Sequence, residues 1–162
     1  MKASAGRTHL DPADIRVLRI LQRDASLSIA EIARQAGMSQ TPCWRRIKKL
    51  KDSGVVRQIA ALVDREKVGL SFASYSFVKL SIPSRDNMEE FDRMVNRWPE
   101  VVICERITGA VDYLLKIVAD DIKDYDDFLR LKLLNNDLVS DVQSRIVIAT
   151  VKDTPALPIR ED

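Results

Sequence analysis

Residues 41–51 constrain the fold more than any other part of the chain, because they fit one helix with two unlike faces. At about 100° per residue, the apolar side consists of Cys43, Ile47 and Leu50. The opposite side carries an aromatic ring and cations, namely Trp44, Arg45, Lys48 and Lys49. We expect Thr41 to cap this helix and Pro42 to occupy its first position, where a missing N–H costs nothing. The pattern suits a helix held to a small core and pressed against phosphates, although a solvated basic face would look the same.

Two shorter helices are predicted before the basic helix. Asp11 and Pro12 suit the start of the first, in which apolar residues recur at helical spacing. Ser28 and Glu31 form a capping box for the second, which ends at Gly37, a residue that tolerates the left-handed conformation. The expected inward residues are Ile15, Leu18, Leu21, Ile29, Ile32, Ala33 and Ala36. Three helices, the last two joined by a short turn that contains glycine, indicate a helix-turn-helix motif.

In a helix-turn-helix, the second helix of the pair enters the major groove and its first residues contact base edges. The side chains that this arrangement assigns to double-stranded DNA are Gln40, Thr41, Trp44, Arg45, Arg46, Lys48 and Lys49. Gln40 suits an adenine edge and Arg45 a guanine edge, while packing against its own helix is the alternative for Trp44. Gly54 is expected to end the helix, and residues 55–59 to follow as an extended wing.

Charge is divided unequally along the chain. Residues 1–65 carry a net charge of +7 and residues 66–162 a net charge of −5. The overall net charge of +2 does not reveal this difference. The basic N-terminal part would attract nucleic acid and the acidic C-terminal part would repel it, so we expect nucleic acid to bind to the N-terminal part alone.

Composition argues against several other classes of protein. With 46% hydrophobic residues in 162, the chain is too apolar to be disordered. No apolar run approaches the ~18 residues that span a bilayer, and residues 1–7 lack a signal-peptide core, so a cytoplasmic protein without membrane contact is expected. Cys43 and Cys104 are expected to be structural residues rather than a disulfide or a metal site. The one histidine, His9, lies in a predicted flexible arm, and no phosphate loop or Ser/His pair is present, so we predict no catalytic residue, metal or cofactor.

The second half of the chain alternates strands and helices in the order β-α-β-β-α-β. The expected strands span residues 72–82, 101–107, 113–119 and about 142–151. One helix is expected to bury Phe91, Met94, Val95 and Trp98. Another, over residues 122 to about 134, is expected to bury Ile122, Tyr125, Leu129 and Leu133. This order predicts a ferredoxin-like fold and an α+β protein.

Such a fold leaves one face of its sheet uncovered, because right-handed crossovers put both helices on the other face. The strands are nevertheless apolar on both sides. In residues 113–119, Tyr113, Leu115 and Ile117 alternate with Leu114 and Val118. In residues 142–151, Ile146 and Ile148 alternate with Val147, Ala149 and Val151. We therefore predict a homodimer in which two sheets pack face to face, which also suits a helix-turn-helix that reads two half-sites.

The order and spacing of four motifs resemble the Lrp/AsnC (feast/famine) family of bacterial and archaeal transcription regulators, from about Leu10 to Ile159. These motifs are Leu10-Asp11-x-x-Asp14, Ser39-x-Thr41-Pro42-Cys43-x-x-Arg46, Gly54-Val55-Val56 and Thr108-Gly109-x-x-Asp112-Tyr113. The resemblance implies an N-terminal winged helix-turn-helix followed by a ferredoxin-like βαββαβ domain that dimerises through its sheet. We expect an arm over residues 1–9, a DNA-binding domain over 10–63, a linker over 64–70, and a dimerisation and effector-binding domain over 71–162.

The same resemblance implies a small-molecule effector, expected to be an amino acid, and homodimers that can assemble into octamers. Gly109, Asp112 and Tyr113 match the family's effector loop. The glycine permits close backbone approach, and the carboxylate of Asp112 suits an α-ammonium group. The alternative is an ordinary turn in which Gly109 supplies a positive φ and Asp112 caps it.

Two other functions compete with this one. An architectural protein would wrap DNA with little sequence preference and without an effector. Siroheme decarboxylases resemble the same two-domain fold, but they are expected to have a degraded basic helix and histidines near a tetrapyrrole. This chain has an intact basic helix and no histidine beyond His9.

Overall fold

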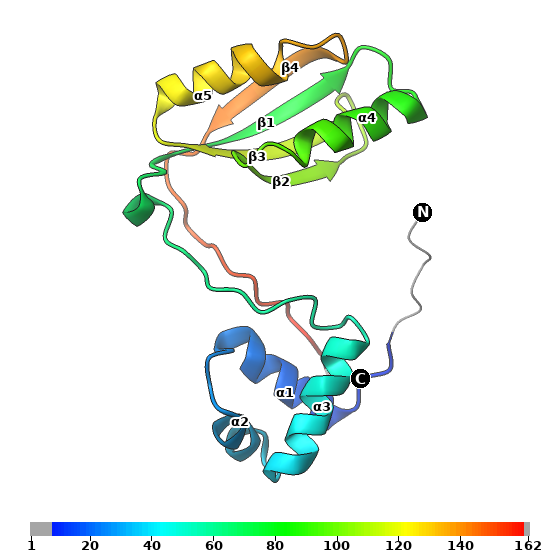
Figure 1. Cartoon of the computed structure of the whole chain (residues 1–162), viewed down its shortest axis with the longest axis vertical. Coiled ribbons are helices and arrows are strands. Elements are labelled where there is room, and N and C mark those ends of the chain that lie inside the picture. Colours follow the sequence, from blue (N-terminus) through cyan, green and yellow to red (C-terminus); the bar gives the residue numbers. More distant parts are fainter. Residues whose placement is uncertain (1–7, 161–162) are drawn as a thin grey trace. The chain divides into compact units, whose positions relative to one another are not determined.

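The computed structural model describes residues 8–160, which form two compact units (Figure 1). The helical unit consists of residues 8–62 together with residues 152–160, and the sheet unit consists of residues 63–151. Most of the predicted arm over residues 1–9 lies outside the described residues. Among those described, no helix has the length and apolar character needed to cross a membrane.

The helical unit contains three helices, α1 (Pro12–Arg23), α2 (Ile29–Ala36) and α3 (Gln40–Asp52). Asp11 caps α1 and Ser28 caps α2, as the sequence predicts, and each helix begins with a full capping box. Gly37 ends α2 in the left-handed conformation with φ of 68°. The apolar sides meet in one core, which consists of Val17, Leu18, Ile32, Ala33, Ala36, Cys43, Ile47 and Leu50. Ile29 was expected inside this core but remains exposed, because it is the first residue of α2.

Helix α3 begins earlier than the sequence pattern predicts. Its N-cap is Ser39, which makes no side-chain capping hydrogen bond, so the expectation that Thr41 caps the helix is wrong. Pro42 therefore occupies the third helical position rather than the first. This position still accommodates proline, because the first N–H groups of a helix have no intrahelical acceptor. The inward stripe of Cys43, Ile47 and Leu50 is buried as predicted.

The segment after α3 turns sharply and then becomes irregular. Gly54 adopts a φ of 73°, and the N–H of Val56 donates to the carbonyl of Leu50 at 2.9 Å. Val55 and Val56 then pack against the helical core. Residues 57–64 have no regular secondary structure, so the predicted wing is an irregular segment and not a hydrogen-bonded strand.

The C-terminal segment belongs to the helical unit, although the sequence pattern placed residues 71–162 in a single second domain. Arg19 on α1 donates to the carbonyl of Ile159 at 2.9 Å. Gln22, one turn further along α1, accepts from the N–H of Leu157 at 2.6 Å and donates to its carbonyl at 3.3 Å. The side chain of Ile159 packs against the helical core. The segment that follows the sheet unit thus completes the core formed by α1, α2 and α3.

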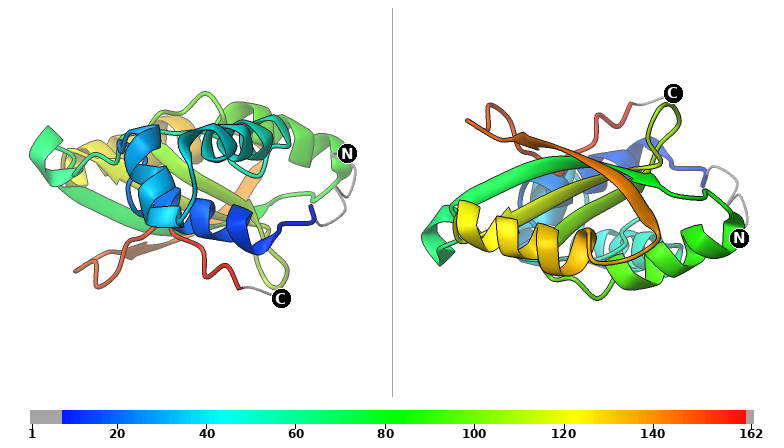
Figure 2. Two further views of the ribbon diagram at one scale, coloured as in Figure 1. Left: turned by 90° about the horizontal axis from the view of Figure 1, so that it is seen from below. Right: turned by 90° about the horizontal axis from the view of Figure 1, so that it is seen from above.

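The sheet unit has the predicted βαββαβ order, preceded by a single turn η1 (Glu66–Val68). Its strands are β1 (Phe72–Leu80), β2 (Val101–Arg106), β3 (Tyr113–Ala119) and β4 (Val139–Ile146). They form one antiparallel sheet in the order β2-β3-β1-β4. Its helices are α4 (Arg85–Val95) and α5 (Ile122–Phe128), which continues as the wider turn η2 (Leu129–Leu133). Both helices cover the same face of the sheet, as expected (Figure 2, right).

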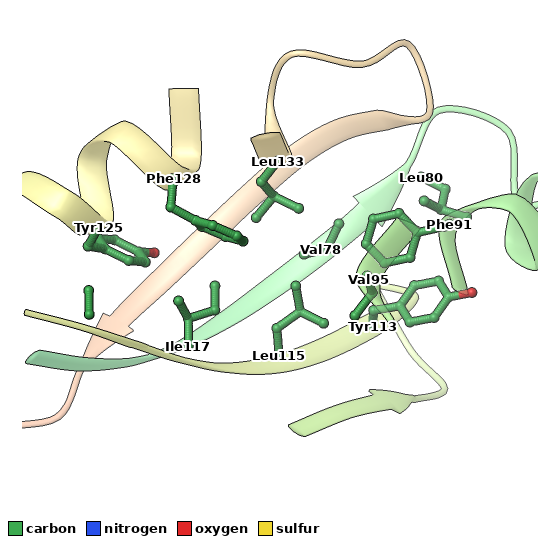
Figure 3. Packing of buried hydrophobic residues seen from close by; sticks show 11 residues of the cluster. Val78, Leu80, Phe91, Val95, Tyr113, Leu115, Ile117, Tyr125, Phe128 and Leu133 are labelled. Atoms are coloured by element: carbon green, nitrogen blue, oxygen red, sulfur yellow. The ribbon is translucent and has the colours of Figure 1, made fainter. Parts of the chain in front are cut away.

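The core of the sheet unit lies between that face and the two helices (Figure 3). It consists of Val78, Leu80, Phe91, Val95, Tyr113, Leu115, Ile117, Ala119, Tyr125, Phe128 and Leu133. Trp98 lies beyond the end of α4 but contributes edge-on ring contacts to Phe91 and Phe128, with centroids 6.4 and 5.5 Å apart. Tyr113, Leu115 and Ile117 therefore face inward, as their alternation predicts.

Two predictions about the last third of the chain are wrong. Ile122 is 61% exposed, because it is the first residue of α5, and Phe128 is buried in this helix beside Tyr125. The last strand spans Val139–Ile146 instead of residues 142–151, and Ile148 and Val151 lie almost wholly in solvent. Pairing with β1 explains the shift. Ile146 lies opposite Ser74, only two residues after β1 begins at Phe72, and the N–H of Val147 still donates to the carbonyl of Ala73 at 2.9 Å. Beyond that bond β1 soon ends, so it cannot pair with a strand that continues to residue 151.

We expect the substitution Ile159→Ser to destabilise the helical unit by about 1 kcal/mol, because it removes a partly buried aliphatic side chain from the core. The matched control is Ile148→Ser, at a position that is 99% exposed. The amide hydrogen exchange rates of α1 and β1 report on the stability of the helical unit and of the sheet unit separately. Faster exchange in α1 with unchanged exchange in β1 supports the assignment of the C-terminal segment, and unchanged exchange in α1 contradicts it.

Candidate functional sites

The exposed side of α3 carries the side chains expected to bind DNA. Gln40, Thr41, Arg45 and Lys48 are exposed, and Trp44 is 48% exposed. The ammonium group of Lys48 lies 5.7 Å from the centroid of the Trp44 ring, which adds a cation–π contact on the helix surface. Arg45 has no ion-pair partner among residues 8–160. One helix face therefore presents a cation with free donors, an aromatic ring and two polar side chains at the helix start.

Arg46 and Lys49, which the sequence pattern also assigned to DNA, form ion pairs with α1. Nη1 of Arg46 lies 2.6 Å from a carboxylate oxygen of Asp11 and 2.6 Å from one of Asp14. Nζ of Lys49 lies 2.9 Å from the other oxygen of Asp14. We call these four side chains the α1–α3 ion cluster. Arg46 lies beside the buried stripe of α3, three residues after Cys43, and this position turns its guanidinium toward α1 instead of toward solvent.

Asp14 is the buried member of the ion cluster, with no exposed side-chain surface. Burial by itself raises the pKa of Asp14, but hydrogen bonds from Lys49 and Arg46 outweigh it and hold the pKa below its usual value. The hydrogen bond from Arg46 is the main reason that the pKa of Asp11 is lowered as well. The cluster is thus ionised at neutral pH. Two carboxylates at the start of α1 thus neutralise two cations of α3.

The second candidate site is the loop between β2 and β3. Gly109 adopts a φ of 128°, a conformation that favours glycine. Asp112 fastens the loop to β1: its N–H donates to the carbonyl of Val78 at 2.9 Å, and its carboxylate accepts from the N–H of Leu80 at 2.8 Å. The N–H of Ile107 also donates to the carbonyl of Asp112 at 2.9 Å. The carboxylate thus has one oxygen committed to the backbone, which is the capping role that the sequence left open.

Tyr113 is part of the core of the sheet unit. It is fully buried, and its ring centroid lies 4.5 Å from that of Phe91. Its hydroxyl donates to a carboxylate oxygen of Asp92 at 2.9 Å and to the carbonyl of Met88 at 3.2 Å, both on α4. Burial is the main cause that raises the pKa of Tyr113, and the adjacent carboxylate of Asp92 adds to it. Gly109 and Asp112 thus lie in the loop itself, whereas the side chain of Tyr113 is buried against α4.

Sequence reasoning missed a pocket of about 480 Å³ at the opposite end of β3. Its apolar wall includes Val118 and Phe128, and its polar wall includes Glu100 and Lys132, whose charged groups lie 2.6 Å apart. The second carboxylate oxygen of Glu100 is buried and has no hydrogen-bond partner in the described chain. The lining residues come from separate segments of the sheet unit, so no local sequence pattern marks this pocket.

Comparison with protein-family models identifies both units. A model of the Lrp/AsnC ligand binding domain matches residues 75–157, and a model of a winged helix-turn-helix DNA-binding domain matches residues 10–57. The chain is 36% identical over 152 residues to the transcriptional regulator AzlB of Bacillus subtilis, covering 94% of this chain and 97% of that protein. It is 35% identical over 150 residues to the DNA-binding transcriptional activator DecR of Escherichia coli, covering 93% and 99% respectively.

Solved structures share the arrangement of the elements. The transcriptional regulator NMB0573 of Neisseria meningitidis, crystallised as a complex with L-Met, gives a TM-score of 0.89 at 37% identity over 93% of this chain and 97% of that chain. An AsnC family regulator from Agrobacterium tumefaciens gives 0.87 at 38% identity, covering 92% and 97%. With the helix-turn-helix, the βαββαβ unit and these relatives in agreement, the chain belongs to the Lrp/AsnC family and is a DNA-binding transcriptional regulator.

Proposed function

We propose that this regulator acts in the cytoplasm as a homodimer, reads operator DNA with the exposed side of α3, and responds to an amino acid bound at the loop between β2 and β3. The observation that carries the proposal is the α3 surface. It combines the exposed guanidinium of Arg45 with the exposed ring of Trp44 on the second helix of a helix-turn-helix. Lys48 supplies phosphate contacts, which set affinity, and Gln40 and Arg45 supply base contacts, which set specificity.

Arg45→Ala should weaken binding to a preferred duplex by about 1–3 kcal/mol and reduce the preference over a scrambled duplex, because it removes a bidentate base contact. Arg45→Lys is the control, since it keeps the charge but loses the planar pair of donors. Fluorescence anisotropy with both duplexes measures the effect. Equal weakening on the two duplexes would assign Arg45 to the phosphate backbone, and a footprint without preferred sites would favour an architectural protein.

The uncovered face of the sheet supports the homodimer. Residues of β1 and β3 that alternate with the core residues face away from the helices, and they include Tyr75, Phe77 and Leu114. Tyr75 is 36% exposed, while Phe77 and Leu114 are partly exposed. Aromatic and aliphatic side chains in adjacent strands make a surface that a second copy of the same sheet can cover by two-fold symmetry.

Phe77→Asp should convert the dimer to a monomer, because it places a charge in the centre of the proposed sheet-to-sheet contact. Ile122→Asp is the matched control, since it makes the same kind of change at an exposed position on α5, on the side of the helices. Light scattering gives the mass of each variant and also distinguishes dimers from octamers. A monomeric mass for the unmodified protein, or a dimeric Phe77→Asp variant, would refute the sheet-to-sheet dimer.

Asp112→Asn should abolish the rise in melting temperature that an amino acid produces, while the protein without ligand keeps nearly its original stability. The amide oxygen still accepts the hydrogen bond from Leu80, but the negative charge that suits an α-ammonium group is gone. Asp112→Ala differs, because it leaves the N–H of Leu80 without an acceptor and should cost about 1–3 kcal/mol. The common amino acids, L-methionine included, are tested by thermal shift.

The control for this experiment is Asp120→Asn, the same change at an exposed carboxylate beyond the other end of β3. A ligand response that survives in Asp112→Asn would move the effector site away from the loop. If Asp120→Asn alone loses the response, the effector site is the pocket that contains Glu100 and Lys132.

A further inference from the structure

The α1–α3 ion cluster attaches α3 to α1 at two points through one side chain. Oδ1 of Asp14 accepts from Arg46 at 2.6 Å and Oδ2 accepts from Lys49 at 2.9 Å. The two cations are three residues apart on α3, so they lie on one strip of the helix surface. Asp11, the N-cap of α1, holds the same Arg46 nitrogen at 2.6 Å. The buried carboxylate of Asp14 thus holds both Arg46 and Lys49, which are neighbours on the surface of α3.

Apolar contacts alone would leave the rotation of α3 poorly defined. The stripe of Cys43, Ile47 and Leu50 packs against α1 and α2 through contacts that have little directional preference. Side-chain tips lie about 6 Å from a helix axis, so a rotation of about 20° moves them by about 2 Å. Hydrogen bonds to base edges do not tolerate a displacement of that size. Recognition of a DNA sequence therefore requires a directional constraint on the rotation of α3. Charged hydrogen bonds at two points supply that constraint.

We propose that Asp14 is a positioning residue for DNA recognition, which fixes the rotation of α3 so that Trp44, Arg45 and Lys48 face the groove. This inference rests on the proposed function of α3. It assigns Arg46 and Lys49 to orientation of the helix instead of contact with phosphates. Buried ion pairs add little net stability, since desolvation offsets the attraction, but they define one arrangement over its neighbours. Loss of the Asp14 charge should therefore change the preference for one DNA sequence over another more than it changes the stability of the fold.

Asp14→Asn tests the proposal because it keeps the size of the side chain but removes its charge. Affinity for a duplex selected from a random pool by the unmodified protein should fall about tenfold. Affinity for a scrambled duplex should stay equal or rise, because the substitution removes a negative charge and releases Lys49 from its ion pair. Asp52→Asn is the control, since it makes the same change of charge at an exposed position at the end of α3. It should alter both affinities by the same factor.

Binding is measured well below the melting temperature, with the folded fraction followed by circular dichroism. Opposite or unequal changes on the two duplexes in Asp14→Asn support the positioning role. An equal fall on both duplexes shows a purely structural residue, and no change on either shows that the ion cluster is dispensable. Both of these results would overturn the proposal.

A second measurement decides the question even if Asp14→Asn does not fold. Lys48→Gln should make the slope of log affinity against log salt less negative by about 0.9, as expected for one lost phosphate contact. Lys49→Gln should leave the slope unchanged, because its ammonium group is held by Asp14. Equal reductions in both variants would refute the proposal. If the unmodified protein shows no preference for any duplex, base reading by α3 fails, while this comparison of adjacent lysines still tests the ion cluster.

Discussion

Helix α3 can be buried on one side only, and the side that it buries determines which side chains are left to bind a ligand. Cys43 and Leu50 have no exposed surface, and Ile47 has 8%. Turning the helix by half a turn would place Arg45 and Lys48 in the core without partners, at a cost far above the gain from an apolar side chain. Hydrophobic burial therefore sets the coarse orientation of the DNA-binding surface, and the charges of α1 refine it.

The sheet unit depends on a similar separation of two faces. The strands β1 and β3 are hydrogen-bonded on both sides, so their alternation sends Val78, Leu115 and Ile117 to the helices and leaves the other face without cover. Neighbouring residues at the start of β3 are then attached to different elements. Asp112 is bonded to the backbone of β1, and Tyr113 is bonded to α4. A molecule that contacts the loop at Gly109 would touch a turn whose base is fixed to both layers of the unit.

Features that depend on local patterns could be predicted from the sequence. The bounds of β3, the caps at Asp11 and Ser28 and the buried stripe of α3 each follow from periodicity or from a capping motif. The βαββαβ order followed as well, because each element carries its own apolar repeat.

Features that depend on distant partners could not be predicted in this way. Arg46 is a cation on an amphipathic helix, and only the fold shows that Asp11 and Asp14 lie next to it. The last strand ends at Ile146, opposite Ser74 and close to the start of its partner β1 at Phe72. The residues after it continue the same β-branched pattern, so the sequence alone predicts a longer strand. The pocket at Glu100 and Lys132 likewise has no local signature.

The hydrogen bonds of Leu157 and Ile159 with α1 have a consequence for the order in which the protein is made. A ribosome releases the three helices early, long before it has synthesised the residues that complete their core. The DNA-binding unit is therefore finished last, after the sheet unit has already left the ribosome. A prematurely terminated chain carries the helices that recognise DNA but lacks the segment that closes their domain. The fold thus makes the DNA-binding unit depend on residues that are synthesised after the whole sheet unit.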